Sequence, residues 1–312
     1  MSLLSYGSVK EFEERLRQAA LCCPNEPENL DRDQNPESGY LKDIFENKEI
    51  LENKEIPVIA AGSFGENLLV EGLDLKDIAC GTILQAGDVV LRITQRGKEC
   101  HSGCRIRELT GDCIMPREGV FAEVIKGGIL RPGEEIFMEN PEKTGCYRAA
   151  VVTLSDKASR GEREDKSGPL LAKLLKDQGF EVIEELILSD EAGELKKNLI
   201  RLADRRDADL IVTTGGTGFA PRDITPEATM AVATKNVPGI AEAIRAGSMK
   251  YTPKAMLSRA VSVIRNRTLI INFPGSPKAV EESFELIKEV LPHGLGILTG
   301  REGECARNGE KS

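Results

Sequence analysis

The chain has 312 residues, which is enough for two domains with separate hydrophobic cores, since a single core stops growing at roughly 250 to 300 residues. Hydrophobic residues make up 40% and charged residues 30%, a composition that excludes a chain disordered along its whole length. The formal net charge of −9 disfavours a broad electrostatic surface for nucleic acid or anionic lipid, so an anionic ligand needs a local site.

The sequence contains neither an apolar stretch of about 20 residues, the length of a membrane span, nor a signal peptide. We therefore expect a cytoplasmic protein that contacts no membrane. The eight cysteines are scattered along the chain, and a reducing compartment would keep them as thiols.

Apolar residues recur at helical spacing from Val9 to Ala20 and stop before Pro24, which predicts an amphipathic helix over 8–21. The following segment, 24–55, is acidic, has the composition of a loop and contains the run ENKEI twice. The repeat is too short to indicate a solenoid. We expect an inserted, exposed loop here.

Short apolar runs separated by glycine turns fill the next part of the chain, from Ile56 to Glu139. The turns have the spacing of a small β-barrel or folded sheet. The expected strands are Thr82–Leu84, Val89–Thr94, Val120–Ile125 and Glu135–Met138. We therefore predict a small β-rich domain over 1–140 and a linker over 141–146.

Strand and helix patterns alternate after the linker, over 147–300, and a polar tail follows over 301–312. This order predicts an α/β fold with a parallel sheet covered by helices on both faces, and a ligand site at the carboxyl ends of the strands. The expected strands are Arg148–Leu154, Val182–Leu188, Asp209–Thr214 and Thr268–Phe273. The expected helices are Ser167–Gly179 with Ser167 as N-cap, Glu194–Arg205, 226–234, 238–250 and Pro277–Leu291.

The third of these strands runs into the glycine-rich turn Thr214-Gly215-Gly216-Thr217-Gly218. Glycines let backbone N–H groups surround a phosphate, and the helix that begins near Pro226 adds the positive end of its dipole. A tight turn without a ligand is the alternative, because such a turn by itself is weak evidence.

The other strand ends add carboxylates and a second glycine turn. Asp156 follows the first strand, Asp190 follows the second, and the loop after the third carries Asp223. The last strand opens into Pro274-Gly275-Ser276-Pro277-Lys278. Carboxylates beside phosphates repel them unless Mg²⁺ bridges the charges, so the combination indicates metal-nucleotide chemistry. The alternative is that each aspartate caps the next helix.

The runs TTGGTGFAPRDITPEAT, AMLSR and INFPGSPKAV resemble the molybdopterin adenylyltransferases, the MogA group, over about Tyr147 to Gly300. The resemblance implies an enzyme that moves AMP from Mg-ATP onto the terminal phosphate of molybdopterin and releases pyrophosphate. It also implies self-association, into trimers, and delivery of the product to a molybdenum insertase.

The same resemblance assigns Asp190 and Asp223 to catalysis and to Mg²⁺. A cation, Arg222 or Lys278, would neutralise the departing pyrophosphate, with solvated surface as the alternative for both. Ser258 is expected to be a polar contact or the cap of a turn. The full set of expected substrate and nucleotide contacts is Ser155, Asp156, Thr214, Gly215, Gly216, Thr217, Gly218, Arg222, Ser258, Pro274, Gly275, Ser276, Pro277 and Lys278.

Residues 62–138 resemble a MOSC domain, the β-rich module of molybdenum-cofactor sulfurases, through GSFGENL, GTILQAGDVVLRITQRGKEC and GDCIMPREGVFAEVIKGGILRPGEEI. The resemblance implies that Cys100 carries sulfur or contacts the pterin, with Lys98, Arg105 and Arg107 as cations that would stabilise its thiolate. The chain is expected to lack the strand that normally opens such a domain, ahead of the first helix.

Alternatives stay open for both halves of the chain. Cys100, His101, Cys104 and Cys113 permit a structural zinc site, although their spacing is poor for one. The second half could instead be a molybdenum insertase, a nucleotide pyrophosphate hydrolase or a non-catalytic scaffold that binds the pterin. ATP consumption in the presence of molybdopterin separates an enzyme from a scaffold.

Overall fold

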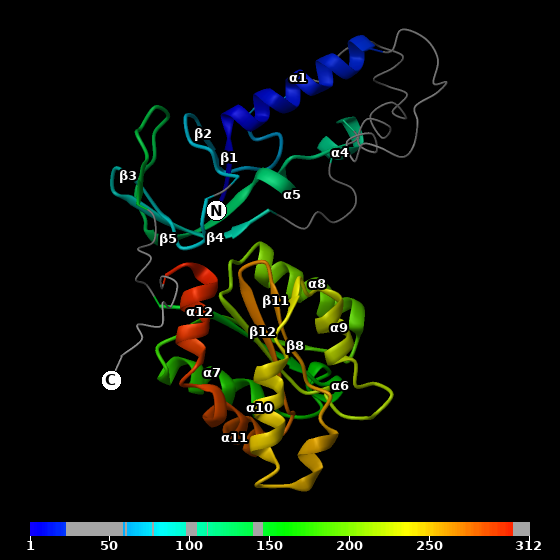
Figure 1. Cartoon of the computed structure of the whole chain (residues 1–312). Coiled ribbons are helices and arrows are strands. Elements are labelled where there is room, and N and C mark those ends of the chain that lie inside the picture. Colours follow the sequence, from blue (N-terminus) through cyan, green and yellow to red (C-terminus); the bar gives the residue numbers. More distant parts are fainter. Residues whose placement is uncertain are drawn as a thin grey trace, which may run out of the picture. The chain divides into compact units, whose positions relative to one another are not determined.

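The computed structural model describes residues 1–22, 59, 61–76, 78–97, 105–110, 112–139 and 146–301. It divides into two compact units, Met1–Pro141 and Glu142–Ser312, each with its own sheet (Figure 1). The predicted loop over 24–55 and nearly all of the predicted linker and tail lie outside the described residues. No helix in the described ranges is long and apolar enough to cross a membrane.

The first unit is built, within the described residues, on a six-stranded sheet in the order β2-β1-β5-β4-β3-β6. β1 and β2 are parallel, and the other neighbouring pairs are antiparallel. The strands are β1 Ser2–Ser5, β2 Leu68–Val70, β3 Ile83–Ala86, β4 Val89–Arg96, β5 Val120–Lys126 and β6 Phe137–Glu139. The helices are α1 Tyr6–Cys22, α4 Arg105–Thr110 and α5 Met115–Glu118. The predicted β-rich fold is confirmed, with small shifts of the strand limits.

β1 lies inside this sheet and ahead of α1, where the sequence analysis expected no strand. Leu3 packs in the core between the strands, whereas Leu4 packs with Phe12 and Leu16 of α1. Successive side chains of a strand point to opposite faces, so a strand buried on both faces has an apolar run instead of an alternation. Two leucines are too few to display that pattern in a sequence.

The second unit has a six-stranded sheet in the order β10-β11-β12-β9-β7-β8, with helices on both faces (Figure 1). Its strands are β7 Arg148–Leu154, β8 Glu181–Leu188, β9 Leu210–Thr214, β10 Lys235–Asn236, β11 Ser262–Arg265 and β12 Thr268–Phe273. Its helices are α6 Asp156–Ser159, α7 Ser167–Asp177, α8 Ala192–Asp204, α9 Thr225–Ala231, α10 Pro238–Ser248, the 3-10 helix η1 Pro253–Leu257, α11 Pro277–Ile287 and α12 Leu291–Thr299.

β7 shows why this sheet is covered on both faces. Ala149 and Val151 pack with residues of α7, α11 and α12, whereas Ala150 and Val152 pack with residues of α8 and α9. All four side chains are buried, so the strand has the continuous apolar sequence of a doubly covered strand. The predicted α/β fold is confirmed.

The predicted parallel sheet is confirmed for four of the six described strands, and the other two add an antiparallel edge. β12, β9, β7 and β8 are parallel, but β11 is antiparallel to β12, and β10 is antiparallel to β11. A tight turn joins β11 to β12, with Asn266 in the left-handed region at a φ of 53°. So short a turn joins only antiparallel neighbours, since a parallel connection needs about a dozen residues.

The start of α7 also differs from the prediction. Ser167 is the first residue of the helix and not its N-cap. The carboxylate of Asp165 accepts hydrogen bonds from the backbone N–H groups of Ser167 at 2.9 Å and Gly168 at 3.2 Å, so this aspartate satisfies the free donors of the first turn. The helix predicted over Pro277–Leu291 is α11, which already ends at Ile287, and a further helix, α12, begins at Leu291.

Candidate active site

The carboxyl ends of β7, β8, β9 and β12 meet at one edge of the second sheet, as predicted. Thr214, the last residue of β9, stands opposite Thr153 of β7 and Phe273 of β12. Leu154 and Leu188 are paired where β7 and β8 end. The loops that leave these four strands therefore begin side by side, although they are far apart in the sequence.

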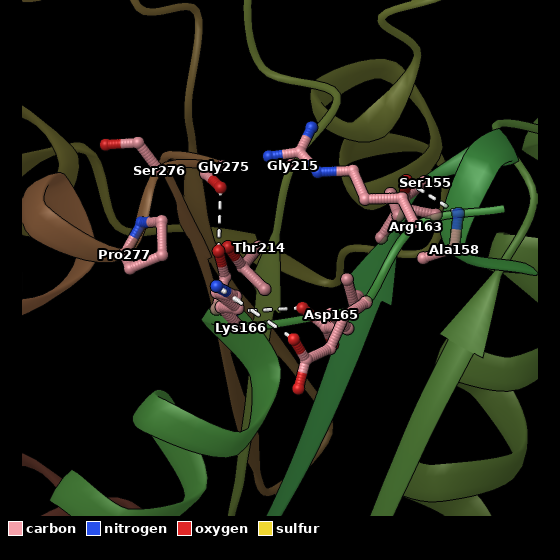
Figure 2. Close-up of a pocket in the computed structure, with 14 residues that line it drawn as sticks. Ser155, Ala158, Arg163, Asp165, Lys166, Thr214, Gly215, Gly275, Ser276 and Pro277 are labelled. Atoms are coloured by element: carbon pink, nitrogen blue, oxygen red, sulfur yellow. Dashed lines mark hydrogen bonds and ion pairs between the residues drawn. The ribbon is translucent and has the colours of Figure 1, made fainter. Parts of the chain in front are cut away.

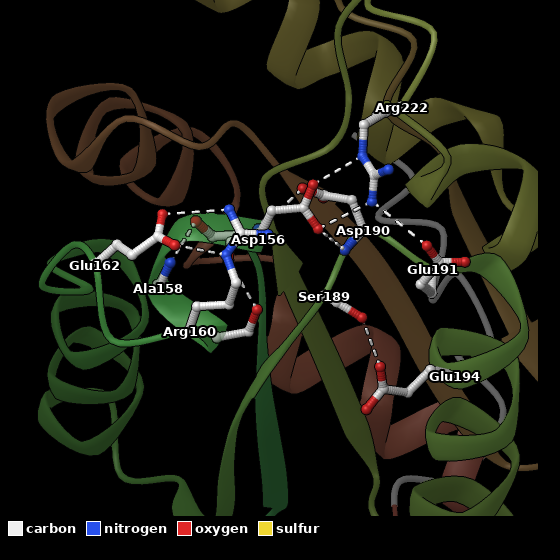
Figure 3. A network of polar contacts seen from close by, with 11 residues as sticks. Asp156, Ala158, Arg160, Glu162, Ser189, Asp190, Glu191, Glu194 and Arg222 are labelled. Carbon is white, nitrogen blue, oxygen red and sulfur yellow. Dashed lines mark hydrogen bonds and ion pairs between the residues drawn. The ribbon is translucent and has the colours of Figure 1, made fainter.

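Asp156 and Asp190 bind each other's backbone at this edge. The N–H of Asp156 donates to Asp190 Oδ2, and the N–H of Asp190 donates to Asp156 Oδ1, both at 3.1 Å. Arg222 joins them from a third loop: its Nε lies 2.7 Å from Asp156 Oδ2, and its Nη2 lies 3.4 Å from Glu191 Oε1 (Figure 3). The N-cap of α6 is Ser155, so Asp156 does not have the capping role that was its alternative.

The surroundings of the two carboxyl groups shift their pKa values in opposite directions. The backbone N–H of Asp190, together with the Arg222 guanidinium, lowers the pKa of Asp156. Burial raises the pKa of Asp190, and the charges of Asp156 and Asp223 raise it further. The Asp190 carboxylate lies within electrostatic reach of Asp156, Asp223 and the Arg222 guanidinium. The negative charge gathered around Asp190 favours a bound cation.

Asp223 lies in the loop between the glycine turn and α9. Its Oδ2 accepts a hydrogen bond from the N–H of Ala220 at 2.8 Å. A Cβ added at Gly218 would come within 2.8 Å of that same oxygen, and a Cβ added at Gly216 would come within 3.5 Å of Asp190 Oδ1. The two glycines therefore let the turn lie against both carboxylates.

The carboxylates fit a partial magnesium site. Within the described residues, no three or more Asp, Glu, His or Cys side chains are grouped so that they could hold a metal ion by themselves. Mg²⁺ in nucleotide sites is usually held by one or two carboxylates and by the substrate phosphates. Asp190 and Asp223 therefore suit a Mg²⁺ ion that arrives with a polyphosphate.

A pocket of about 490 Å³ adjoins this network (Figure 2). Two hydrogen bonds of 2.7 Å fix its wall: Thr214 Oγ1 donates to the Pro274 carbonyl, and Ser167 Oγ donates to the Gly275 carbonyl. A Cβ added at Gly275 would lie 3.3 Å from the Cα of Gly215, so the two glycine turns are in contact. The predicted contacts that line the pocket are Ser155, Thr214, Gly215, Gly275, Ser276 and Pro277.

The pocket also contains residues that the sequence analysis missed, from the segment between α6 and α7. Asp165 accepts a hydrogen bond from Thr153 Oγ1 at 2.6 Å and so ties this segment to β7. Arg163 extends its guanidinium toward Gly215 (Figure 2), and no carboxylate among the described residues forms an ion pair with it. An aspartate just before an apolar helix is a sequence signal for a helix start and would have identified Asp165. Arg163 has no such signal.

Other predicted contacts have partners outside the pocket. Ser258 Oγ accepts a hydrogen bond from the N–H of Ala260 at 3.3 Å, which matches the turn-cap alternative. Lys278 is 86% exposed and pairs with Glu282 of its own helix at 3.8 Å. Thr217, within the glycine turn, is buried, and its carbonyl accepts a hydrogen bond from the N–H of Arg259 at 3.0 Å. None of these three lines the pocket.

Of the cysteines considered for sulfur or zinc, only one is described. Cys100, His101 and Cys104 lie outside the described residues, as does Lys98. Cys113 is buried in the core of the first unit, beside the apolar side chains of α1.

Asp190→Asn is expected to raise the free energy of unfolding at neutral pH. Because the pKa of Asp190 is raised in the folded chain, the folded state binds this proton more tightly than the unfolded state does. Stability therefore falls as the pH rises from the ordinary aspartate pKa through the raised one, and the charged form costs stability at neutral pH. Asparagine has no charge, and its oxygen still accepts from the N–H of Asp156.

This effect is measured by urea unfolding at neutral pH and at a pH below the pKa of Asp190 in both the folded and the unfolded chain. The stability gained by the variant should be present at neutral pH and shrink in acid. A variant less stable than the wild type at neutral pH would show that the fold compensates the charge of Asp190.

Comparison with known proteins matches the two units separately. Residues 150–293 match the family described as "Probable molybdopterin binding domain", and residues 45–137 match the MOSC domain family. The molybdopterin adenylyltransferase of Helicobacter pylori strain J99 is 43% identical over 152 residues, which are 48% of this chain and 86% of that protein. That of Escherichia coli K12 is 41% identical over 155 residues, 47% of this chain and 79% of that protein. The crystal structure of the molybdopterin biosynthesis enzyme MoaB of Thermus thermophilus matches this chain with a TM-score of 0.48 and 47% sequence identity. The match covers 49% of this chain and 97% of the MoaB chain.

Proposed function

The chain belongs to the molybdopterin adenylyltransferase family, and from this premise we propose that its second unit transfers AMP from Mg-ATP to the terminal phosphate of molybdopterin. An oxygen of the molybdopterin phosphate attacks the α-phosphorus of ATP and forms a new P–O bond. The bond from the α-phosphorus to the oxygen that bridges to the β-phosphate breaks. The products are adenylylated molybdopterin and pyrophosphate.

The observation that carries this proposal is the contrast between two adjoining surfaces. Asp156, Asp190 and Asp223 make one surface acidic, which suits a polyphosphate that brings Mg²⁺. The pocket beside it is lined by two glycine turns, by the first residues of α7 and α11, and by the charged segment Arg163, Glu164, Asp165 and Lys166. Asp165 is held by hydrogen bonds within the protein, and Glu164 pairs with Lys166. The backbone N–H groups and Arg163 therefore suit a phosphate without its own metal. Such a site holds two anionic reactants close together without uncompensated repulsion.

Charge neutralisation on the leaving group is the main chemical demand of this transfer. Mg²⁺ held by Asp190 and Asp223 would neutralise charge on the polyphosphate oxygens. We assign the second positive charge to Arg222, whose side chain is 60% exposed at the rim of the acidic network. Lys278 is the weaker choice, because it pairs with Glu282 of its own helix, whereas Arg222 pairs with Asp156 of the acidic network.

Incubation of the full chain with molybdopterin and Mg-ATP tests the proposal. We expect one adenylylated molybdopterin and one pyrophosphate for each ATP consumed. Hydrolysis of ATP without adenylylated pterin would indicate a nucleotide pyrophosphate hydrolase instead. Binding of molybdopterin without any ATP consumption would indicate a scaffold.

Arg163→Ala is expected to raise the KM for one of the two substrates about tenfold. A hydrogen bond between charged groups contributes about 1.5 to 3 kcal/mol, and the pocket guanidinium pairs with no carboxylate of the described residues that would compete for it. Steady-state rates with ATP and molybdopterin varied separately show which substrate phosphate the guanidinium binds.

Arg160→Ala is the matched control for this measurement. Arg160 lies in the same segment, but its Nε donates to Glu162 Oε1 at 2.8 Å, and it does not line the pocket (Figure 3). Both KM values should stay near those of the wild type. Equal effects of Arg160→Ala and Arg163→Ala would mean that only the net charge of the segment matters.

For the first unit we propose a role in handling the pterin cofactor or its sulfur, supported by the match of residues 45–137 to the MOSC family. Cys100 is the candidate sulfur carrier within that range. Self-association into trimers, delivery of the product to a molybdenum insertase and a cytoplasmic location stay predictions.

A further inference from the structure

A guanidinium that the sequence analysis did not select holds both ends of the loop that carries Asp223. Arg259 follows η1, and its Nε donates to the Gly218 carbonyl at 2.6 Å. Its Nη2 donates to the carbonyl of Asp223, and its Nη1 pairs with the carboxylate of Glu227. Its own N–H donates to the Thr217 carbonyl at 3.0 Å. The start and the end of the loop are therefore bound to one side chain.

The middle of this loop has few other anchors among the described residues. Ala220 and Asp223 form a local turn, in which the N–H of Ala220 donates to Asp223 Oδ2 and the N–H of Asp223 donates to the Ala220 carbonyl, both at 2.8 Å. Phe219 is 69% exposed, so apolar packing does not hold the tip. The ion pair from Arg222 to Asp156 reaches out of the loop, but most of that side chain is exposed and screened by solvent.

Only a guanidinium has the geometry to bind both ends of this loop at once. Its N–H groups form a planar fork that reaches the Gly218 carbonyl, the Asp223 carbonyl and the Glu227 carboxylate at the same time. A lysine ammonium is a single charged point on a flexible stem and cannot span all three acceptors. Because Asp223 Oδ2 also lies against Gly218, a change in the distance between the loop ends moves the carboxylate.

We propose that Arg259 is a positioning residue for adenylyl transfer, which keeps the Asp223 carboxylate against the glycine turn by binding both ends of the loop. It acts through Asp223 and touches neither Mg²⁺ nor substrate. The inference rests on the proposed function, because its readouts are the rate and the Mg²⁺ dependence of that reaction.

Arg259→Ala tests the inference in the full chain. We expect kcat to fall at least tenfold, about 1.4 kcal/mol in the activation barrier, with a change of less than about threefold in the KM for molybdopterin. The Mg²⁺ concentration that gives half of the maximal rate should rise, because Asp223 is displaced. Added guanidinium ion should restore part of the rate of Arg259→Ala, because the ion can enter the space left by the arginine side chain. It should not raise the rate of Arg259→Lys, because the lysine side chain still occupies that space.

Arg245→Ala is the matched structural control. Arg245 Nη1 donates to the carbonyls of Ala260 at 2.6 Å and of Ser258 at 3.4 Å, so it anchors the segment next to Arg259 without reaching the loop of Asp223. We expect Arg245→Ala to lose stability in urea and to keep kcat and the Mg²⁺ requirement of the wild type.

Two results would overturn the inference: wild-type kcat in Arg259→Ala, or an equal loss of kcat in Arg245→Ala. If Arg259→Ala does not fold, Arg259→Lys decides, because a lower kcat with a higher Mg²⁺ requirement supports the inference and wild-type kinetics overturns it. A wild-type chain that forms no adenylylated molybdopterin would overturn the proposed function instead.

Discussion

Asp223→Asn is expected to lower kcat for adenylylation at least tenfold, about 1.4 kcal/mol in the activation barrier, and to leave the fold intact. The change removes the negative charge of a carboxylate that we propose as a ligand of Mg²⁺. The asparagine oxygen still accepts the hydrogen bond from the N–H of Ala220, so the loop keeps its local turn. The side chain belongs to no apolar core, so the midpoint of urea unfolding should shift little.

Asp177→Asn is the matched control for the loss of charge. Asp177 is exposed at the end of α7 and does not line the pocket. Product formation from molybdopterin and Mg-ATP should match that of the wild type. Wild-type turnover by Asp223→Asn would remove Asp223 from the mechanism.

Gly215→Ala is expected to destabilise the second unit by at least about 2 kcal/mol and to abolish adenylylation. Gly215 has a φ of 97°, in the left-handed region that side chains rarely adopt. A Cβ at this position would lie 2.4 Å from the carbonyl oxygen of Leu154. That oxygen belongs to the end of β7, so relief of the clash moves the backbone that leads into Ser155 and Asp156.

Gly193→Ala is the control for a glycine without such a restriction. Gly193 lies in the first turn of α8, and nothing lies within 4 Å of a Cβ added there. Alanine in a helix is favoured over glycine by up to about 1 kcal/mol, so this variant should be at least as stable as the wild type and fully active. Urea unfolding and the adenylylation assay measure both variants. Unchanged stability and activity in Gly215→Ala would show that the turn rearranges without cost.

The sequence by itself determined the second unit's main elements and the edge of the sheet where the site lies. The apolar runs of β7, β9 and β12 are long enough to display burial on both faces. Parallel strands place their carboxyl ends together, so the residues after each run could be assigned to one edge. Asp156, Asp190 and Arg222, predicted from three separate loops, do form one network.

Only the tertiary structure decided which polar groups share hydrogen bonds at that edge. Arg163 is one of four cations in the stretch 157–166, and Arg259 ends the run AMLSR, from which the sequence analysis selected only Ser258. Their side-chain type by itself does not distinguish them from solvated surface arginines. Their surroundings come from residues about 40 or more positions away, Gly218 for Arg259 and Gly215 for Arg163. The short strands β1 and β10 are also set by pairing with strands far along the chain, whereas β11 pairs with its neighbour β12 across a tight turn. Two to four residues carry too little pattern to specify a partner, so the completed sheet determines them.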